Sequence, residues 1–243
     1  MQDAALLLAA SGAAGFLRGV TGFGFALAAV PLYSLSMAPL QAVILAQMLQ
    51  IAAAPVDFIQ IRRSVDGKAL GLLCAGALLC TPVGAYFATR LPADVLRLTI
   101  AAVVLLGLAA LLARIRIRDG RGPTIMAGAL AGLLGGLAAM PGPPAVAYFL
   151  GRGADKTVSR ASLLLFFAFT AVIALGALAI SADVLRWDML LRAAMAWPFV
   201  MAGTWLGTML FNRLGDGHYR IAALGVLFVS AILTGAKGLA GLL

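Results

Sequence analysis

The chain has 243 residues, of which 63% are hydrophobic and 11% charged, and its mean hydropathy is +1.05. A soluble domain of this length cannot bury so much apolar surface, so the composition excludes a soluble globular protein and indicates an integral membrane protein. The net charge of +9 comes from 18 Lys and Arg against nine acidic residues, and because the basic residues form no patch interleaved with aromatics, nucleic-acid binding is not expected.

Eight apolar segments are each long enough to span a bilayer: residues 4–35, 38–59, 69–89, 93–113, 124–150, 159–181, 188–211 and 219–241. The first and the fifth differ from the others because Gly and Pro interrupt them. They also occupy corresponding positions in the two halves of the chain. The sequence therefore predicts an all-α integral membrane protein with two broken segments.

The first segment, residues 4–35, is too long for one straight transmembrane helix. Such a helix would measure about 50 Å, against a hydrocarbon core of about 30 Å. Five glycines lie within Gly12–Gly24, and Arg18 is the charged residue among them. We expect a re-entrant hairpin that turns over Arg18–Gly22 and returns as a half-helix over Phe23–Pro31.

The two halves share a pattern that predicts an internal duplication, with repeats at 1–121 and 122–243. Each repeat would be a Gly-rich hairpin followed by three transmembrane helices. The matching residues are Gly15 and Gly19 with Gly132 and Gly136, and Gly84, Arg90, Leu91 and Arg97 with Gly207, Arg213, Leu214 and Arg220. The Gly-x-x-x-Gly pairs are equally typical of a close helix contact.

Loop charges indicate how the repeats are oriented. If both broken segments fold back as hairpins, more of the Lys and Arg residues gather on one side of the membrane than if every segment crosses once. That arrangement places the Arg114–Arg121 loop in the cytoplasm and both termini outside. It also makes the repeats inverted, so that the two hairpin tips meet from opposite sides.

The two tips have the chemistry of an anion site. The first carries Arg18, Thr21, Gly22 and Gly24 before a half-helix, and the second places Gly142, Pro143 and Pro144 in the first turn of another. Two helix N-termini and an arginine favour a small oxyanion. Arg18 has the alternative of reaching an interface or capping helix carbonyls, and the second repeat has Gly135 in its place.

A polar stripe runs along the second segment. Gln47, Gln50, Asp57 and Gln60 fall on one helical face, with Pro55 able to kink it. Such a stripe either lines a pathway or makes interhelical hydrogen bonds. Asp57 is the candidate for proton coupling, and its alternative is a pairing with Arg62 or Arg63 near the cytoplasmic interface.

Enzymatic and metal chemistry is not expected. The chain has one histidine, His218, no Glu and no pair of carboxylates at catalytic spacing. Cys74 and Cys80 fall on different faces of one apolar segment, so neither a disulfide nor a metal pair is expected. No cofactor is predicted.

The tips and repeats carry a resemblance to a known family. The run Gly15-Phe-Leu-Arg-Gly-Val-Thr-Gly-Phe-Gly-Phe-Ala-Leu-Ala-Ala-Val-Pro31, the second-half glycines with Gly142-Pro-Pro144, and the Gly84…Arg90-Leu91 element resemble the sulfite exporter TauE/SafE family. The resemblance implies export or uptake of sulfite, organosulfonates or related small anions across the inner membrane. Met140-Pro141 departs from the family pattern, which commonly has another Gly there.

These observations together predict a secondary transporter of a small anion such as sulfite, an organosulfonate or a carboxylate, working by alternating access in the cell inner membrane. The partners expected are the anion, the lipid bilayer and a coupled proton. Two alternatives stay open: a passive anion channel, and a membrane scaffold whose hairpins only pack. The identity of the anion, the direction of transport and the oligomeric state are open as well.

Overall fold

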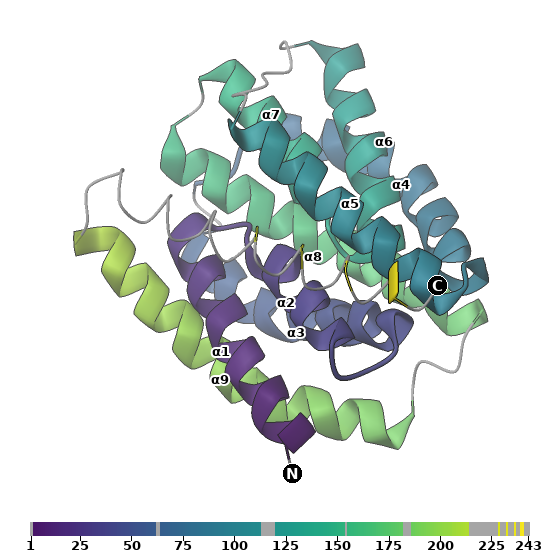
Figure 1. Ribbon diagram of the computed structural model, residues 1–243. Coiled ribbons are helices and arrows are strands. Elements are labelled where there is room, and N and C mark those ends of the chain that lie inside the picture. Colours follow the sequence, from purple (N-terminus) through teal and green to yellow (C-terminus); the bar gives the residue numbers. More distant parts are fainter. Residues whose placement is uncertain are drawn as a thin grey trace.

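The computed structural model describes residues 2–61, 64–112, 120–153, 155–181 and 186–213, together with residues 228, 232, 236, 239 and 240. Every regular element in these ranges is an α-helix, in the order α1 Gln2–Thr21, α2 Phe25–Ser34, α3 Pro39–Ile61, α4 Gly67–Arg90, α5 Ala93–Leu112, α6 Arg121–Ala138, α7 Gly142–Arg152, α8 Lys156–Ser181 and α9 Trp187–Arg213 (Figure 1). The eighth predicted segment, 219–241, lies almost wholly outside the described residues.

Five of these helices are long and apolar enough to cross a membrane: α1, α3, α4, α8 and α9. This confirms the all-helical, multi-pass membrane character that the composition predicts. The first and fifth apolar segments are both broken, into α1 with α2 and into α6 with α7. The two breaks therefore fall in the segments that Gly and Pro interrupt.

The first segment is a hairpin. Ser11 on α1 and Tyr33 on α2 are joined by a hydrogen bond of 2.8 Å, which requires α2 to return alongside α1. The turn comes later than the expected Arg18–Gly22, because α1 continues to Thr21 and α2 begins at Phe25. The N–H of Gly22 still donates to the Arg18 carbonyl, and the positive φ of Gly22, 78°, then ends the helix.

Thr21 organises the turn that follows. Its hydroxyl donates to the Leu17 carbonyl at 2.7 Å and accepts from the N–H of Gly24 at 2.9 Å. The Thr21 hydroxyl therefore fixes the backbone between α1 and α2.

The fifth segment also doubles back. Helix α6 ends at Ala138, and the next residue, Ala139, has a left-handed φ of 59° and donates its N–H to the Gly135 carbonyl at 2.9 Å, as in an αL cap. Helix α7 then begins at Gly142, with both prolines in its first turn as expected. Its last residue, Arg152, pairs with Asp66 at 2.7 Å, beside the start of α4.

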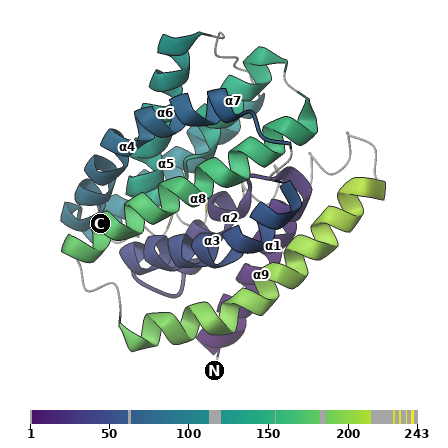
Figure 2. The ribbon, with the colours of Figure 1, turned by 180° about the vertical axis from the view of Figure 1, so that it is seen from behind.

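Two pairs of helices pack closely, α1 with α9 and α4 with α6 (Figures 1 and 2). Glycines allow the contact, because a Cβ at Gly15 would strike the backbone of Val200 and one at Gly132 the backbone of Ala77. Contacts advance in the same direction along both partners, so each pair is parallel. The Gly-x-x-x-Gly residues of both repeats thus lie in helix contacts.

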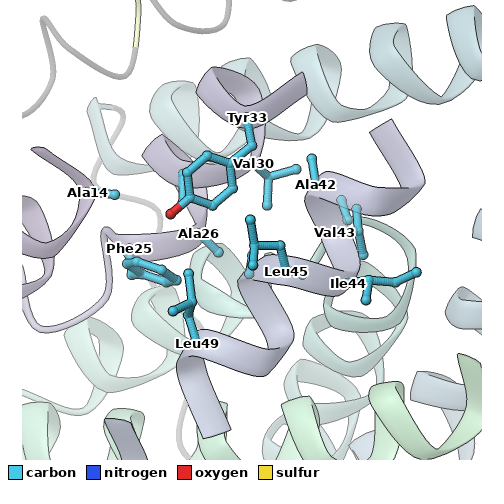
Figure 3. Packing of buried hydrophobic residues seen from close by; sticks show 14 of the residues in the cluster. Ala14, Phe25, Ala26, Val30, Tyr33, Ala42, Val43, Ile44, Leu45 and Leu49 are labelled. Atoms are coloured by element: carbon cyan, nitrogen blue, oxygen red, sulfur yellow. The ribbon is translucent and has the colours of Figure 1, made fainter. Parts of the chain in front are cut away.

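Helix α2 sits at the centre of the main apolar cluster. Phe25, Val30 and Tyr33 on α2 pack with Leu45 and Leu49 on α3 (Figure 3). Nine of the ten residues of α2 are buried, and a helix that is apolar on every side must lie inside the protein. Packing in this core therefore fixes the position of α2, and the first turn of α2 lies close to the end of α1.

Candidate functional site

A small pocket lies at the tip of the first hairpin. It is lined by residues from the end of α1, the turn, α2, α3 and α8, namely Arg18, Gly22, Phe23, Phe25, Gln50, Leu164, Phe167 and Ala168. Its volume of about 10 Å³ leaves room for roughly one water molecule. Three of the sequence-predicted site residues, Arg18, Gly22 and Gln50, share this pocket.

Arg18 is the buried cation of the pocket. It lies in the last turn of α1 and is 6% exposed. Its Nη2 donates to Oδ2 of Asp57, which forms an ion pair between α1 and α3. Its other terminal nitrogen, Nη1, is buried and makes no hydrogen bond within the described part of the chain. A buried donor of this kind is rare, because leaving it unpaired costs free energy.

Gln50 supplies a second donor of the same kind. It lies on α3, is 8% exposed, and its Nε2 also lacks a partner among the described residues. The rest of the lining is largely aromatic and aliphatic. Two unsatisfied N–H donors in an otherwise apolar pocket fit a ligand that offers acceptor oxygens.

The start of α2 strengthens this preference. Phe25, the first residue of α2, lines the pocket, so the positive end of the α2 dipole lies next to Arg18 and Gln50. The N–H groups of a first helical turn have no partner within the helix. The half-helix that the sequence predicts after the first turn therefore begins at the pocket, and its N-terminus is suited to an anion there.

The structure gives Asp57 a partner on α1. Its side chain is 13% exposed and pairs with Arg18. Arg62 and Arg63, the partners suggested by the sequence, lie outside the described residues. Asp57 lies in the last two turns of α3. These turns pass the end of α1, so the Asp57 side chain reaches Arg18.

Arg160 lies beside the pocket, and the sequence analysis does not single it out. It lies inside α8, where Nη2 donates to the Gly19 carbonyl at 2.9 Å and to Oγ1 of Thr208 at 3.1 Å. Gly19 directly follows Arg18, the partner of Asp57, so this second cation lies near the ion pair. The available signal was a cation one turn inside an apolar helix.

Gln47 takes the structural role that the polar stripe allows. It is 1% exposed, and its Nε2 donates to the Gly135 carbonyl at 2.8 Å, which links α3 to α6. The stripe thus divides: Gln47 makes an interhelical hydrogen bond and Gln50 lines the pocket. The side chain of Gln60 lies outside the described residues.

The second tip touches the first without lining the pocket. A Cβ at Gly142 would lie 3.8 Å from both the Phe23 carbonyl and the Phe167 ring. Pro143 packs on the other side, where its Cβ would be 3.3 Å from a Cβ at Gly107 of α5. Gly142 therefore adjoins the first tip and Pro143 packs against α5, while Gly142, Pro143 and Pro144 do not line the pocket.

The comparisons with known proteins agree with the fold. The model of the sulfite exporter TauE/SafE family matches residues 7–234, a range that includes both hairpins and every residue of the pocket. No curated protein and no solved structure matches the chain. The chain therefore belongs to the sulfite exporter TauE/SafE family, whose members are membrane transport proteins for sulfite-type anions rather than enzymes.

Proposed function

We propose that this protein is a secondary transporter that carries a small oxyanion, such as sulfite, an organosulfonate or a related carboxylate, by alternating access. Family membership supports anion transport. Two donors of the pocket, Nη1 of Arg18 and Nε2 of Gln50, have no hydrogen-bond partner in the part of the chain that the structure describes, and this observation carries the choice of an oxyanion.

The charges around the pocket support the same ligand. Arg18 and Arg160 contribute two positive charges and Asp57 one negative charge. Among the residues that the structure describes, these three side chains therefore carry one net positive charge, which a monovalent anion neutralises. In a low-dielectric interior that complementarity contributes more than it does in water.

The size of the pocket supports a conformational cycle. A site with room for about one water is smaller than an oxyanion with three or more heavy atoms. Binding then requires the walls to separate, and the wall that joins Phe23 and Phe25 is the hairpin turn. Alternating access expects a closed site of this kind between the two open states.

Equivalent contacts in the two halves support the inverted-repeat arrangement. A Cβ at Gly19 would strike the Thr204 carbonyl, and one at Gly136 the Thr81 carbonyl. Gly84 approaches the Leu133 carbonyl, just as Gly207 approaches that of Phe16, the residue at the matching place in the first repeat. Each repeat thus uses the same residues to hold the other.

The same inverted arrangement gives the proposed location: a cell inner membrane, with both termini outside and the Arg114–Arg121 loop in the cytoplasm. It requires α1 to run parallel to α9 and α4 parallel to α6, as their glycine contacts do. A tag in that loop tests it. Labelling of the tag from outside intact cells would refute the orientation.

The function is tested in proteoliposomes by measuring whether labelled sulfite accumulates against its concentration gradient, with and without a pH step. A transporter concentrates the anion, a passive channel only equilibrates it, and a scaffold does neither. The decisive variant is Arg18→Gln combined with Asp57→Asn, which removes both members of the ion pair together, so that neither is left without its direct partner. Arg186→Gln is a matched surface control. Unchanged accumulation by the double variant would overturn the proposal.

A further inference from the structure

Arg160 joins three helices at the tip of the first hairpin. From α8 its Nη2 reaches the Gly19 carbonyl on α1 at 2.9 Å and the Thr208 hydroxyl on α9 at 3.1 Å. Thr208 in turn donates to the Thr204 carbonyl at 2.8 Å. The stem of Arg160 also packs on the turn, since a Cβ at Gly22 would lie 2.7 Å from its Cγ. The guanidinium is therefore held in place beside the pocket.

The charge of Arg160 changes what Arg18 can do. Asp57 lies in the field of both arginines, because it pairs directly with Arg18 and Arg160 binds the carbonyl of the next residue, Gly19. Without Arg160, Arg18 and Asp57 would form a closed neutral pair in a buried site. An anion would then have to compete with the Asp57 carboxylate for the same guanidinium, at a large electrostatic cost.

We infer that Arg160 is a positioning residue of the anion pocket: it compensates the charge of Asp57, so that the Nη1 donor of Arg18 stays available to the substrate. This inference rests on the proposed function. Arg160 lies in the second half of the chain and Arg18 in the first, so the positive charge of the pocket comes from both halves. The second-half cation is supplied by α8, and the position that corresponds to Arg18 is Gly135.

Charge arithmetic gives a test that a merely structural role would not pass. Arg160→Gln leaves Arg18 against Asp57, with no net charge. Adding Asp57→Asn restores one net positive charge without restoring any contact of Arg160. Sulfite and methanesulfonate are titrated into the purified protein in detergent by calorimetry. We expect Arg160→Gln to weaken binding by about tenfold or more and the double variant to recover most of that loss.

Arg160→Lys and Arg186→Gln complete the set. Arg160→Lys keeps the charge and is expected to bind with an affinity within a few fold of the wild type. Arg186→Gln, on the surface, is expected to bind like the wild type. Thermal melts of every variant report folding. Wild-type affinity in Arg160→Gln, no recovery in the double variant, or a lysine variant as weak as the glutamine one would each overturn the inference.

The failure of this inference is distinguishable from the failure of the proposed function. If the wild type binds neither sulfite nor methanesulfonate, the proposed function and the inference both fall. If the wild type binds and the Arg18→Gln, Asp57→Asn variant does not, while Arg160→Gln binds normally, only the role of Arg160 is overturned.

Discussion

Ser11 on α1 and Tyr33 on α2 share a hydrogen bond of 2.8 Å, although 22 residues separate them along the chain. The Ser11 hydroxyl already donates to the Leu7 carbonyl at 2.7 Å, so in this pair the Tyr33 hydroxyl is the donor. This contact closes the first hairpin and orients the buried helix α2. It also gives the hairpin a polar link inside an apolar core.

The direction of the Tyr33–Ser11 hydrogen bond predicts that substitutions at the two residues lower the free energy of unfolding by different amounts. Ser11→Ala leaves the fully buried Tyr33 hydroxyl without its acceptor, at a cost of about 1–3 kcal/mol. Tyr33→Phe removes the donor, while Ser11 keeps its bond to Leu7, so the cost is about 1 kcal/mol. Equilibrium unfolding in mixed detergent micelles measures both. A larger loss for Tyr33→Phe than for Ser11→Ala would contradict the assignment.

The Arg18–Asp57 pair predicts strong coupling between the two charges. Arg18→Gln or Asp57→Asn alone breaks this largely buried ion pair and leaves the other charge without its direct partner, at about 3–5 kcal/mol. The two substitutions together remove both charges and cost less than the sum of the single losses. A double-mutant cycle on unfolding free energies measures the difference. Additive losses would show that the two side chains do not interact.

The helix pair α4 and α6 predicts a sharp difference among glycines. Gly132→Ala places a Cβ against the backbone of Ala77, so the helices must separate, at about 1–3 kcal/mol. Gly176 on α8 has open space around its Cα, so Gly176→Ala is neutral or stabilising by up to about 1 kcal/mol. Thermal melts compare the two variants. Equal melting temperatures would refute the close contact.

Asp66 predicts a stability that depends on pH. The N–H of Ala69 and, after it, the Arg152 guanidinium hold the pKa of the Asp66 carboxyl below its ordinary value. A lowered folded-state pKa stabilises the protein above the unfolded pKa, and this contribution is lost as the pH falls through the folded value. The window therefore lies below about pH 4.

The matched variant is Asp66→Asn, since Asn still caps a helix but cannot titrate. We expect the melting temperature of the wild type to fall more between neutral and acidic pH than that of Asp66→Asn. Arg152→Gln removes only the second partner and is expected to give an intermediate slope. Identical slopes in the wild type and Asp66→Asn would exclude Asp66 as a source of the acid sensitivity.

Much of the fold and part of the site could be predicted from the sequence. The membrane class follows from composition, and the breaks in the first and fifth segments follow from segment length together with Gly and Pro. These are local properties of the chain, so they need no knowledge of packing. Arg18 and Gln50 were identified for a similar reason, because a polar residue inside an apolar segment is conspicuous.

Only the tertiary structure decided how the polar residues are partnered. Asp57 pairs with Arg18, Gln47 binds the Gly135 carbonyl, and Arg160 ties α8 to the tip. The pocket also draws on Phe167, which no sequence pattern distinguishes from other core aromatics. Each of these contacts joins helices that are distant in the chain. The facing surfaces depend on how the glycine-lined pairs α1 with α9 and α4 with α6 come together, and helical periodicity alone does not specify that packing.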